Sequence, residues 1–300
     1  MREIKLKISV LTPTYNRAEF LGKLYNSLIE NSKYEIQIEW LIMDDGSTDE
    51  TKTVVKKLQE IESRNLEIKY FYQENQGKMA AINKLAELST GDLIADCDSD
   101  DWFTSNAFEI IIKEYEKNKD NLQDIYAFCF LKYDTNGNNM GKQFINEKTT
   151  MFDLYFKEGE DGEKAIVFLS NIRKQYKHEL ENGEKFVTEA RMYHKMDLKY
   201  KMICVNEPIM ICEYQKEGYT KNINKQFKEN PYGYFEYFKE ILSRNMQKVT
   251  YKKRLYVIKH YILFGYLTKK HDKRDVKGFL NKILYCILYV PGTIKSRRFC

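Results

Sequence analysis

Short apolar runs alternate with segments of helical periodicity over the first hundred residues. Residues 8–12, 36–43, 66–72 and 93–95 are rich in β-branched and aromatic side chains and read as four strands. The segments between them carry apolar residues at three-to-four spacing, as at Leu21, Leu24 and Leu28, which is typical of amphipathic helices. Strands that alternate with helices of this length predict βαβ units and a mostly parallel sheet.

The pattern loosens after Trp102. It predicts a helix over 105–117, a strand over 125–133 and a helix within 185–196. A strand-like pair around Asn206-Glu-Pro falls within 200–214, and from about residue 226 the chain is helical, aromatic and increasingly basic. We therefore expect an α/β fold, a mixed, mostly parallel sheet flanked by helices, followed by a C-terminal helical extension.

Polar clusters follow three of the predicted strands. They are Pro13–Arg17, Asp44–Ser47 and Asp96–Asp101. Ligands of open α/β sheets bind beyond the carboxyl ends of the strands, so we expect all three clusters at one rim of the sheet.

Composition narrows the class of protein. The 300 residues contain 43% hydrophobic side chains, enough for a sizeable core, and 14% aromatic residues, which excludes a disordered chain. The six cysteines are dispersed and form no CxxC pair, so neither a disulfide framework nor a zinc knuckle is expected. No leader-like segment and no run of about 18 apolar residues are visible, which predicts a cytoplasmic protein.

The net charge of +5 comes from the tail. Residues 251–300 carry 13 Lys and Arg against two acids, a balance of +11, whereas the first 250 residues carry 36 against 42. No nucleic-acid-binding motif accompanies this charge, so no nucleic-acid partner is expected. The apolar stretches 255–267 and 279–290 lie among these basic residues, a pattern typical of helices that attach peripherally to an anionic membrane surface. The alternative is that both helices pack on the protein or pair two copies in a homodimer.

The acidic cluster Asp96-x-Asp98-x-Asp100-Asp101 carries the strongest chemical signal. Mg²⁺ and Mn²⁺ prefer carboxylate oxygens and usually take one or two from the protein, with phosphate and water completing the shell. A solvated acidic turn is the alternative interpretation. An EF-hand is disfavoured because Asp101 stands where that loop needs glycine.

Two further fragments suit a nucleotide. A carboxylate of Asp44-Asp45-Gly46-Ser47 can accept from a base N–H or a ribose hydroxyl, although turn chemistry alone would also explain it. Asn75-Gln-Gly77-Lys78 opens a helix, whose N-terminal amides and lysine suit a phosphate.

In order and spacing, these pieces resemble the successive signatures of family 2 glycosyltransferases of the GT-A fold across residues 4–103. The segments that carry the resemblance are Thr12-Pro-Thr-Tyr-Asn-Arg17, Met43-Asp-Asp-Gly-Ser-Thr-Asp49, Asn75-x-Gly-Lys-x-x-Ala-x-Asn83 and Asp98-Ser-Asp-Asp-Trp102. The resemblance implies a Rossmann-like nucleotide-binding half, a nucleotide-sugar donor that is usually a UDP-sugar, and an Mn²⁺ or Mg²⁺ ion. It implies donor-binding roles for Pro13, Tyr15, Arg17, Asp45, Lys78 and Asp98, with Asp45 on the base, and a metal-binding role for Asp100, with Asp101 as a helper.

The second half of the chain matches more loosely. The segment from Gly183 to Arg191 resembles the family segment that carries the catalytic base, which makes Glu189 the predicted base and Glu184 its rival. The stretch 206–218 resembles a bacterial subgroup in which this region closes over the donor, so Glu213 and Tyr214 are weaker candidates, for which packing in the sheet is the alternative.

The sequence thus predicts an inverting glycosyltransferase of bacterial surface polysaccharide synthesis, with a glycan or lipid-linked glycan as acceptor. Its expected domains are a GT-A domain over 1–220, divided into a donor half, 1–103, and an acceptor half, 104–220, and a helical basic tail over 221–300. A sugar nucleotidyltransferase and a non-catalytic nucleotide-sugar binding module are the alternatives. The first usually has a Gly-rich basic loop after strand one, where this chain reads Thr-Pro-Thr-Tyr-Asn-Arg.

Overall fold

The computed structural model describes residues 6–61, 63–213, 223–270 and 272–299, which divide into two compact units. The first unit comprises Met1–Met151, Glu160–Lys177 and Tyr193–Gln215. The second comprises Phe152–Gly159, His178–Met192 and Lys216–Cys300, so it includes two segments that precede the tail in the sequence.

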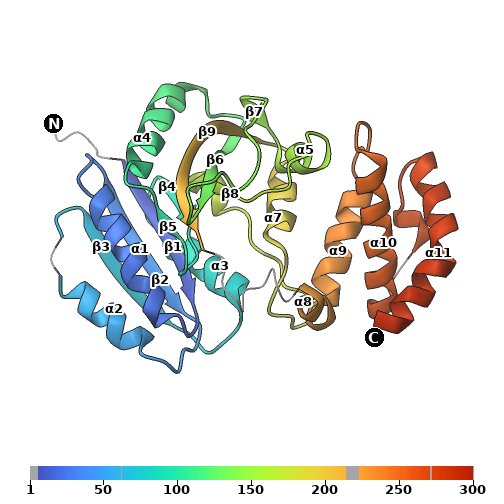
Figure 1. Ribbon diagram of the computed structural model, residues 1–300, viewed down its shortest axis with the longest axis horizontal. Helices are drawn as coiled ribbons and strands as arrows, with labels where there is room; N and C mark the ends of the chain where they lie inside the picture. Colours follow the sequence, from blue (N-terminus) through green and yellow to red (C-terminus); the bar gives the residue numbers. More distant parts are fainter. Residues whose placement is uncertain (1–5, 62, 214–222, 271, 300) are drawn as a thin grey trace. The chain divides into compact units, whose positions relative to one another are not determined.

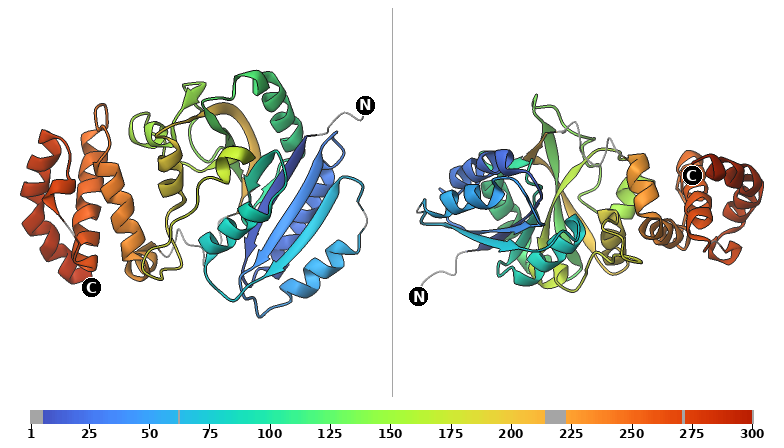
Figure 2. Two further views of the ribbon diagram at one scale, coloured as in Figure 1. Left: turned by 180° about the vertical axis from the view of Figure 1, so that it is seen from behind. Right: turned by 90° about the horizontal axis from the view of Figure 1, so that it is seen from below.

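The first hundred residues fold as the alternation predicts (Figure 1). Each expected strand and helix is present, with its ends shifted by a few residues at most. These elements are β1 (Lys7–Thr14), α1 (Ala18–Asn31), β2 (Gln37–Asp44), α2 (Thr51–Gln59), β3 (Leu66–Tyr72), α3 (Lys78–Leu88) and β4 (Leu93–Asp96). The strands pair in parallel in the order β3-β2-β1-β4. Because crossovers are right-handed and the path reverses after β3, α1 and α2 cover one face and α3 the other (Figure 2).

The remaining strands extend the sheet beyond β4 in the order β8-β6-β9-β5, with mixed directions. The helix α4 and the short η1 precede β6, and β7 pairs with β9 off the main path. The bounds are β5 (Trp102–Phe103), α4 (Ala107–Asn118), η1 (Lys119–Asn121), β6 (Ile125–Asp134), β7 (Lys148–Thr149), α5 (Met151–Phe156), β8 (Lys164–Leu169), α6 (Ser170–Arg173), α7 (Glu189–Met196) and β9 (Lys201–Cys212). The predicted mixed, mostly parallel sheet with flanking helices and C-terminal helices is confirmed.

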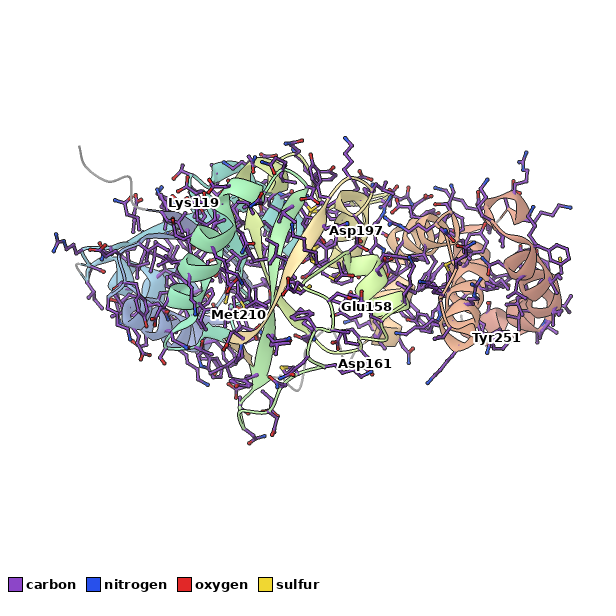
Figure 3. The ribbon with its side chains drawn as sticks, turned by 90° about the horizontal axis from the view of Figure 1, so that it is seen from above. Lys119, Glu158, Asp161, Asp197, Met210 and Tyr251 are labelled. Carbon is purple, nitrogen blue, oxygen red and sulfur yellow. The ribbon has the colours of Figure 1, made fainter. Side chains whose placement is uncertain are left out.

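The expected strand pair around Asn206 is wrong, because 201–212 form the single strand β9. Its register against β6 jumps from Val205 to Pro208, which lacks the N–H that a regular ladder needs. The displaced Asn206 uses its side chain instead, accepting from Phe144 N at 2.7 Å and donating to Phe144 O at 3.0 Å. Beyond this bulge β9 continues to Cys212, and its Met210 (labelled in Figure 3) pairs with Phe103 of β5.

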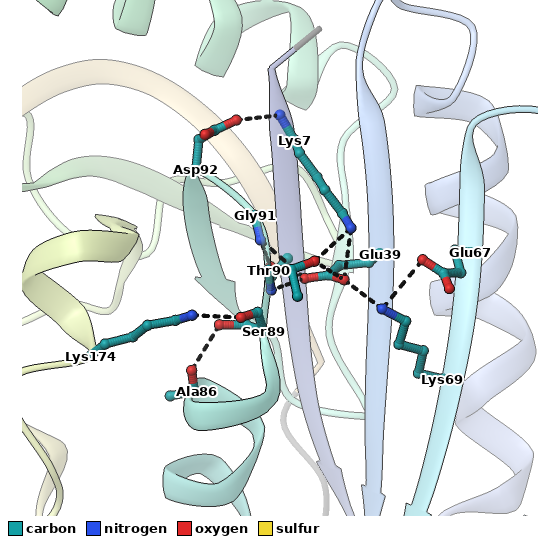
Figure 4. A network of polar contacts seen from close by, with 11 residues as sticks. Lys7, Glu39, Glu67, Lys69, Ala86, Ser89, Thr90, Gly91, Asp92 and Lys174 are labelled. Carbon is teal, nitrogen blue, oxygen red and sulfur yellow. Dashed lines mark hydrogen bonds and ion pairs between the residues drawn. The ribbon is translucent and has the colours of Figure 1, made fainter. Parts of the chain in front are cut away.

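A buried carboxylate joins β1, β2, β3 and the loop before β4. Glu39 of β2 is fully buried and accepts hydrogen bonds from Ser9 of β1 and from the backbone and hydroxyl of Thr90 (Figure 4). Lys69 of β3 and Lys7 of β1 place their ammonium groups 2.9 and 3.0 Å from Glu39 Oε2. Burial alone would raise the pKa of Glu39, but the hydrogen bonds from Ser9, Thr90 and Lys69 hold it well below its ordinary value.

Glu39→Gln is expected to lower the free energy of unfolding by about 2 kcal/mol at pH 7, because charged hydrogen bonds are lost from a buried site. A lowered folded-state pKa means that ionised Glu39 stabilises the fold above its ordinary pKa of 4.5, and this contribution is lost as the pH falls below it. Urea denaturation should therefore show a gap between wild type and variant that narrows from pH 6 to pH 3.5. Glu67→Gln, which removes a mostly exposed partner of Lys69, is the matched control with a change below about 0.5 kcal/mol. A gap that widens on acidification would contradict the assignment.

The second unit is helical and is built around aromatic side chains. Besides most of α5 and the start of α7, it contains α8 (Ile223–Glu229), α9 (Pro231–Leu242), α10 (Tyr251–Thr268), the short η2 (Lys273–Asp275) and α11 (Phe279–Phe299). The core includes Phe235, Phe238, Tyr261 and Phe264, which α9 and α10 contribute. Gly292 lets α11 approach α10 closely, because a Cβ at that position would lie 2.9 Å from Ile262 Cγ2. Among the described residues, no helix is long and apolar enough to cross a membrane.

Candidate active site

Hydrogen bonds join the loops after β1 and β2. Asp45 N donates to Thr14 O at 2.9 Å, and Asn16, in the left-handed region at φ 52°, donates its N–H to Ser47 Oγ at 2.9 Å. Thr48 N returns a bond to Asn16 Oδ1 at 2.7 Å. The two polar clusters therefore form one continuous rim at the carboxyl ends of β1 and β2, as the sequence predicts.

Asp45 is buried in this rim and accepts three hydrogen bonds from the protein. Its donors are Gln73 Nε2 at 2.6 Å, Gln76 N at 2.8 Å and Gly77 N at 2.8 Å. Gly46 lies at φ 86°, a backbone conformation that favours glycine. A Cβ there would also lie only 3.0 Å from Asn75 N, so the position suits the smallest residue. A carboxylate has about four acceptor positions, so at most about one is left for the N–H of a nucleobase.

The loop that Asp45 holds leads directly into α3. Gly77, at φ 93°, ends the loop, and Lys78 is the first residue of the helix. The Lys78 ammonium lies 2.7 Å from both carboxylate oxygens of Asp98. The structure thus brings together a lysine at a helix N-terminus and the acidic cluster after β4. The lysine and the helix N-terminus suit a diphosphate, and the carboxylates suit a cation that accompanies it.

The acidic cluster is a tight turn, in which Asp101 N donates to Asp98 O at 3.0 Å. Burial, and then repulsion from the carboxylates of Asp98 and Asp101, raise the pKa of Asp100 to about 6. Arg17 acts in the opposite direction on Asp100, which brings the loop after β1 into the same electrostatic site. The turn concentrates negative charge at Asp98 and Asp100.

Asp101 differs from its neighbours because it is buried and paired with Lys132 of β6 at 2.8 Å. Glu163 lies 3.6 Å from the same ammonium. Burial alone would lower the pKa of Lys132, but Asp101 and Glu163 raise it, so this lysine stays protonated. Sequence reasoning missed Lys132, because β6 is buried at every position from Ile125 to Leu131 and shows no alternation that would mark the next lysine as an inward residue.

Lys132→Met is expected to lower the free energy of unfolding by about 3–5 kcal/mol, because it leaves Asp101 buried and unpaired. Lys132→Met/Asp101→Asn should recover most of that loss, since both charges are then gone. Chemical denaturation measures both variants, with Lys113→Met on the exposed surface of α4 as the control. A double variant that is no more stable than Lys132→Met would contradict a charge-pair role.

The carboxylates of the acidic cluster differ in how well they suit a divalent cation. Asp100 and the half-exposed Asp98 offer hard oxygen ligands whose mutual repulsion a cation would relieve, whereas Asp101 is committed to Lys132. Within the described ranges, no group of three or more His, Cys, Asp or Glu side chains could hold a metal ion. Asp98 and Asp100 are two neighbouring carboxylates, which suits the mode in which one or two protein carboxylates share Mg²⁺ or Mn²⁺ with phosphate and water.

The other predicted donor residues lie around this rim. Pro13 is buried within β1, where it is paired in register with Met43. Tyr15 is 49% exposed at the loop surface, and the Arg17 guanidinium lies 5.4 Å from the centre of the Phe20 ring. Together with Asp45, Lys78, Asp98 and Asp100, these residues all belong to the first unit.

Both candidate bases belong to the second unit. Glu189 is the partly buried first residue of α7. Glu184 accepts hydrogen bonds from Tyr232 N at 2.6 Å and Gly233 N at 2.7 Å, at the start of α9. Glu184 therefore has a capping role, which favours Glu189 as the base.

Glu213 and Tyr214, the weaker candidates for the donor site, follow the end of β9. Glu213 forms an ion pair with Lys23 of α1 at 3.0 Å. The same lysine lies 3.6 Å from the ring centre of Trp102, which ends the acidic motif. Tyr214 lies outside the described residues.

Comparison with known proteins identifies a matching family model. Residues 9–201 match the model described as glycosyl transferase family 2. An uncharacterized glycosyltransferase of Mycoplasma genitalium is 37% identical over 131 residues, which are 43% of this chain and 44% of that relative. A GalNAc(5)-diNAcBac-PP-undecaprenol beta-1,3-glucosyltransferase of Campylobacter jejuni is 31% identical over 140 residues, 46% of this chain and 42% of that relative. The matched segments thus span less than half of these curated relatives.

Among solved structures, S. aureus TarS 1-349 in complex with UDP-GlcNAc superimposes with a TM-score of 0.65. The superposition covers 98% of this chain and 90% of that one at 16% identity. This likeness confirms the predicted GT-A fold.

Proposed function

The chain belongs to glycosyl transferase family 2, and from this premise we propose that it transfers a sugar from a nucleoside-diphosphate sugar, most simply a UDP-sugar, to a hydroxyl group of a glycan. The observation that carries the proposal is the rim at which Asp45, Lys78, Asp98 and Asp100 meet, beyond the carboxyl ends of the parallel strands. We further propose that residues 1–103 form the donor half and 104–220 the acceptor half of the catalytic domain, with 221–300 as the tail.

Each rim residue has a task suited to its chemistry. Asp45 offers its remaining acceptor position to a base N–H, and Tyr15 covers the nucleoside from the loop surface. Lys78 exchanges its contact with Asp98 for the donor diphosphate, and Arg17 adds positive charge beside Asp100. A divalent cation held by Asp100, with Asp98 beside it, would neutralise charge on the leaving diphosphate.

Inversion needs a single displacement and one general base. Glu189 is proposed to take the proton of the acceptor hydroxyl. As it does so, the oxygen of that hydroxyl attacks the anomeric carbon from the face opposite the diphosphate. The C–O bond to the diphosphate breaks as the new glycosidic bond forms, and the diphosphate leaves with the electron pair.

For the acceptor we propose a glycan or lipid-linked glycan of bacterial surface polysaccharide synthesis. The name of the Campylobacter jejuni relative, which includes an undecaprenol-linked acceptor, supports this class. A lipid-linked acceptor would place the enzyme in the cytoplasm with peripheral attachment to the inner face of the plasma membrane.

Product analysis tests the proposal directly. A panel of UDP- and GDP-sugars with Mn²⁺ is first screened by thermal shift, in which a bound donor raises Tm. The selected donor is then incubated with glycan acceptors, and release of the nucleoside diphosphate is measured. We expect release that depends on the acceptor. Release of pyrophosphate from a nucleoside triphosphate and a sugar phosphate would indicate a nucleotidyltransferase, and binding without release would indicate a binding module.

A further inference from the structure

The helix α11 exposes an apolar stripe. Its inner face packs in the core of the second unit through residues such as Leu284 and Tyr285. Its opposite face carries large apolar side chains at helical spacing that remain exposed, with Phe279 at 83% and Ile287 at 64%. We call this set the outer stripe, which comprises Phe279, Leu280, Ile283, Ile287, Val290 and Ile294.

The outer stripe distinguishes α11 from the segment 255–267, which is also apolar and aromatic in sequence. The stretch 255–267, within α10, contributes Val257, Ile258, Tyr261 and Ile262 to the core, so packing explains most of its apolar character. Tyr251, which begins α10, is more than half exposed (Figure 3). In α11, by contrast, apolar residues occupy both faces, and the core accounts for one of them. A contiguous exposed apolar surface of this kind marks an interaction site.

Positive charge surrounds the beginning of the outer stripe. The connection from α10 to α11 exposes Lys269, Lys270, Lys273 and Lys277, and Lys282 is exposed on α11 itself. The two acids of this connection are engaged within the unit: Asp272 pairs with Arg274 at 2.6 Å, and Asp275 accepts from Tyr261 Oη at 2.8 Å. The sequence of α11 contains no Asp or Glu. The region therefore presents apolar and positive chemistry together.

We propose that the outer stripe is a docking surface for an anionic lipid bilayer, with α11 lying in the headgroup region rather than crossing it. An interfacial helix inserts apolar side chains to a depth of about 5–10 Å, and nearby lysines bind anionic headgroups. A second copy of the chain is a poorer occupant, because pairing two such faces would bring like charges together. The proposal rests on the proposed function in one respect: docking on a bilayer would give the enzyme access to a lipid-linked acceptor.

The test is co-sedimentation of the full chain with vesicles of phosphatidylcholine, with and without phosphatidylglycerol. Binding to the anionic vesicles is expected, and it should weaken as salt is raised. Phe279→Ser/Ile283→Ser/Ile287→Ser should reduce the vesicle partition coefficient at least tenfold. Ile61→Ser/Ile145→Ser/Leu198→Ser, which changes exposed apolar residues of the first unit, is the matched control and should bind as wild type does.

A second pair of variants isolates the charge contribution. Lys273→Gln/Lys277→Gln/Lys282→Gln should weaken binding by about fivefold for each lysine at low salt. Lys52→Gln/Lys56→Gln/Lys57→Gln removes the same charge from the exposed surface of α2 and should leave binding near the wild-type value. Equal losses in both triple variants would indicate a net-charge effect and would overturn the assignment of the surface.

Two other outcomes would also overturn the proposal. One is a full chain that ignores anionic vesicles, and the other is a dimer, measured by light scattering, that the stripe variant dissociates. Transfer to a short soluble glycan is measured in the same preparations. Because the outer stripe lies outside the proposed donor site, normal transfer without vesicle binding would refute this inference alone, whereas vesicle binding without transfer would refute the proposed function alone.

Discussion

Asp100→Asn is expected to reduce glycosyl transfer by about 10³-fold or more while the fold stays intact. The substitution keeps the shape of the side chain but removes the charge that would hold the divalent cation, and several kcal/mol of charge stabilisation on the leaving diphosphate correspond to a factor of this size. Stability should not fall, since Asp100 is repelled by Asp98 and Asp101 and its loss relieves that repulsion. Initial rates at saturating donor, together with Tm, measure the two effects separately.

Chelation gives an independent arm of the same prediction. Treating the wild-type protein with a chelator should reproduce the defect, and added Mn²⁺ or Mg²⁺ should restore the rate. Asp120→Asn, at an exposed position outside the rim, is the control and should retain full activity. Full activity of Asp100→Ala in the presence of chelator would refute the metal assignment.

Glu189→Gln is expected to lower kcat by about 10²–10⁴-fold while donor binding is retained. The amide keeps the volume of the side chain but cannot accept the proton of the acceptor hydroxyl. A loss of this size in kcat is typical when a general base is removed. Donor affinity, measured by thermal shift or calorimetry, should change little, because the donor-binding residues lie in the first unit. The split between an unchanged donor Kd and a lowered kcat identifies a chemical role.

Glu184→Gln serves as the counterpart in the same loop. Because Glu184 accepts from the backbone amides of Tyr232 and Gly233, its substitution should destabilise the start of α9 rather than block proton transfer. A reduced Tm with a nearly normal kcat is the expected pattern. Loss of kcat in Glu184→Gln with normal turnover in Glu189→Gln would exchange the two roles.

Local patterns were sufficient for the donor half of the fold. Residues 66–72 read as a strand and form β3 with the same ends, and the polar clusters after β1, β2 and β4 meet as parallel topology requires. Periodicity and turn residues are encoded within short windows, and the alternation of strands with helices implies parallel pairing, which explains this success. The strand β8 was not predicted, because its apolar run of about five residues has no alternation that separates a strand from a buried helix segment.

Contacts between distant residues could not be predicted in the same way. Asp101 and Lys132 are 31 positions apart on different elements, and only the folded sheet shows that one acid of the motif is neutralised by a mostly buried lysine. Likewise, α11 is apolar on both faces, so its periodicity cannot tell which face is inward. The donor-binding, metal-binding and catalytic roles stay predictions that the variants above test.

Asp45 has a consequence for the interpretation of mutational scans. Its carboxylate accepts from Gln73, Gln76 and Gly77, so it anchors the loop that delivers Lys78 in addition to any contact with a nucleobase. An inactive alanine variant would therefore report the collapse of a loop as much as the loss of a base contact. Selection for a different nucleobase would meet the same constraint, because a residue with two tasks cannot change for one of them. Changes in donor preference should instead accumulate at neighbours such as the exposed Tyr15, whose side chain is available for change.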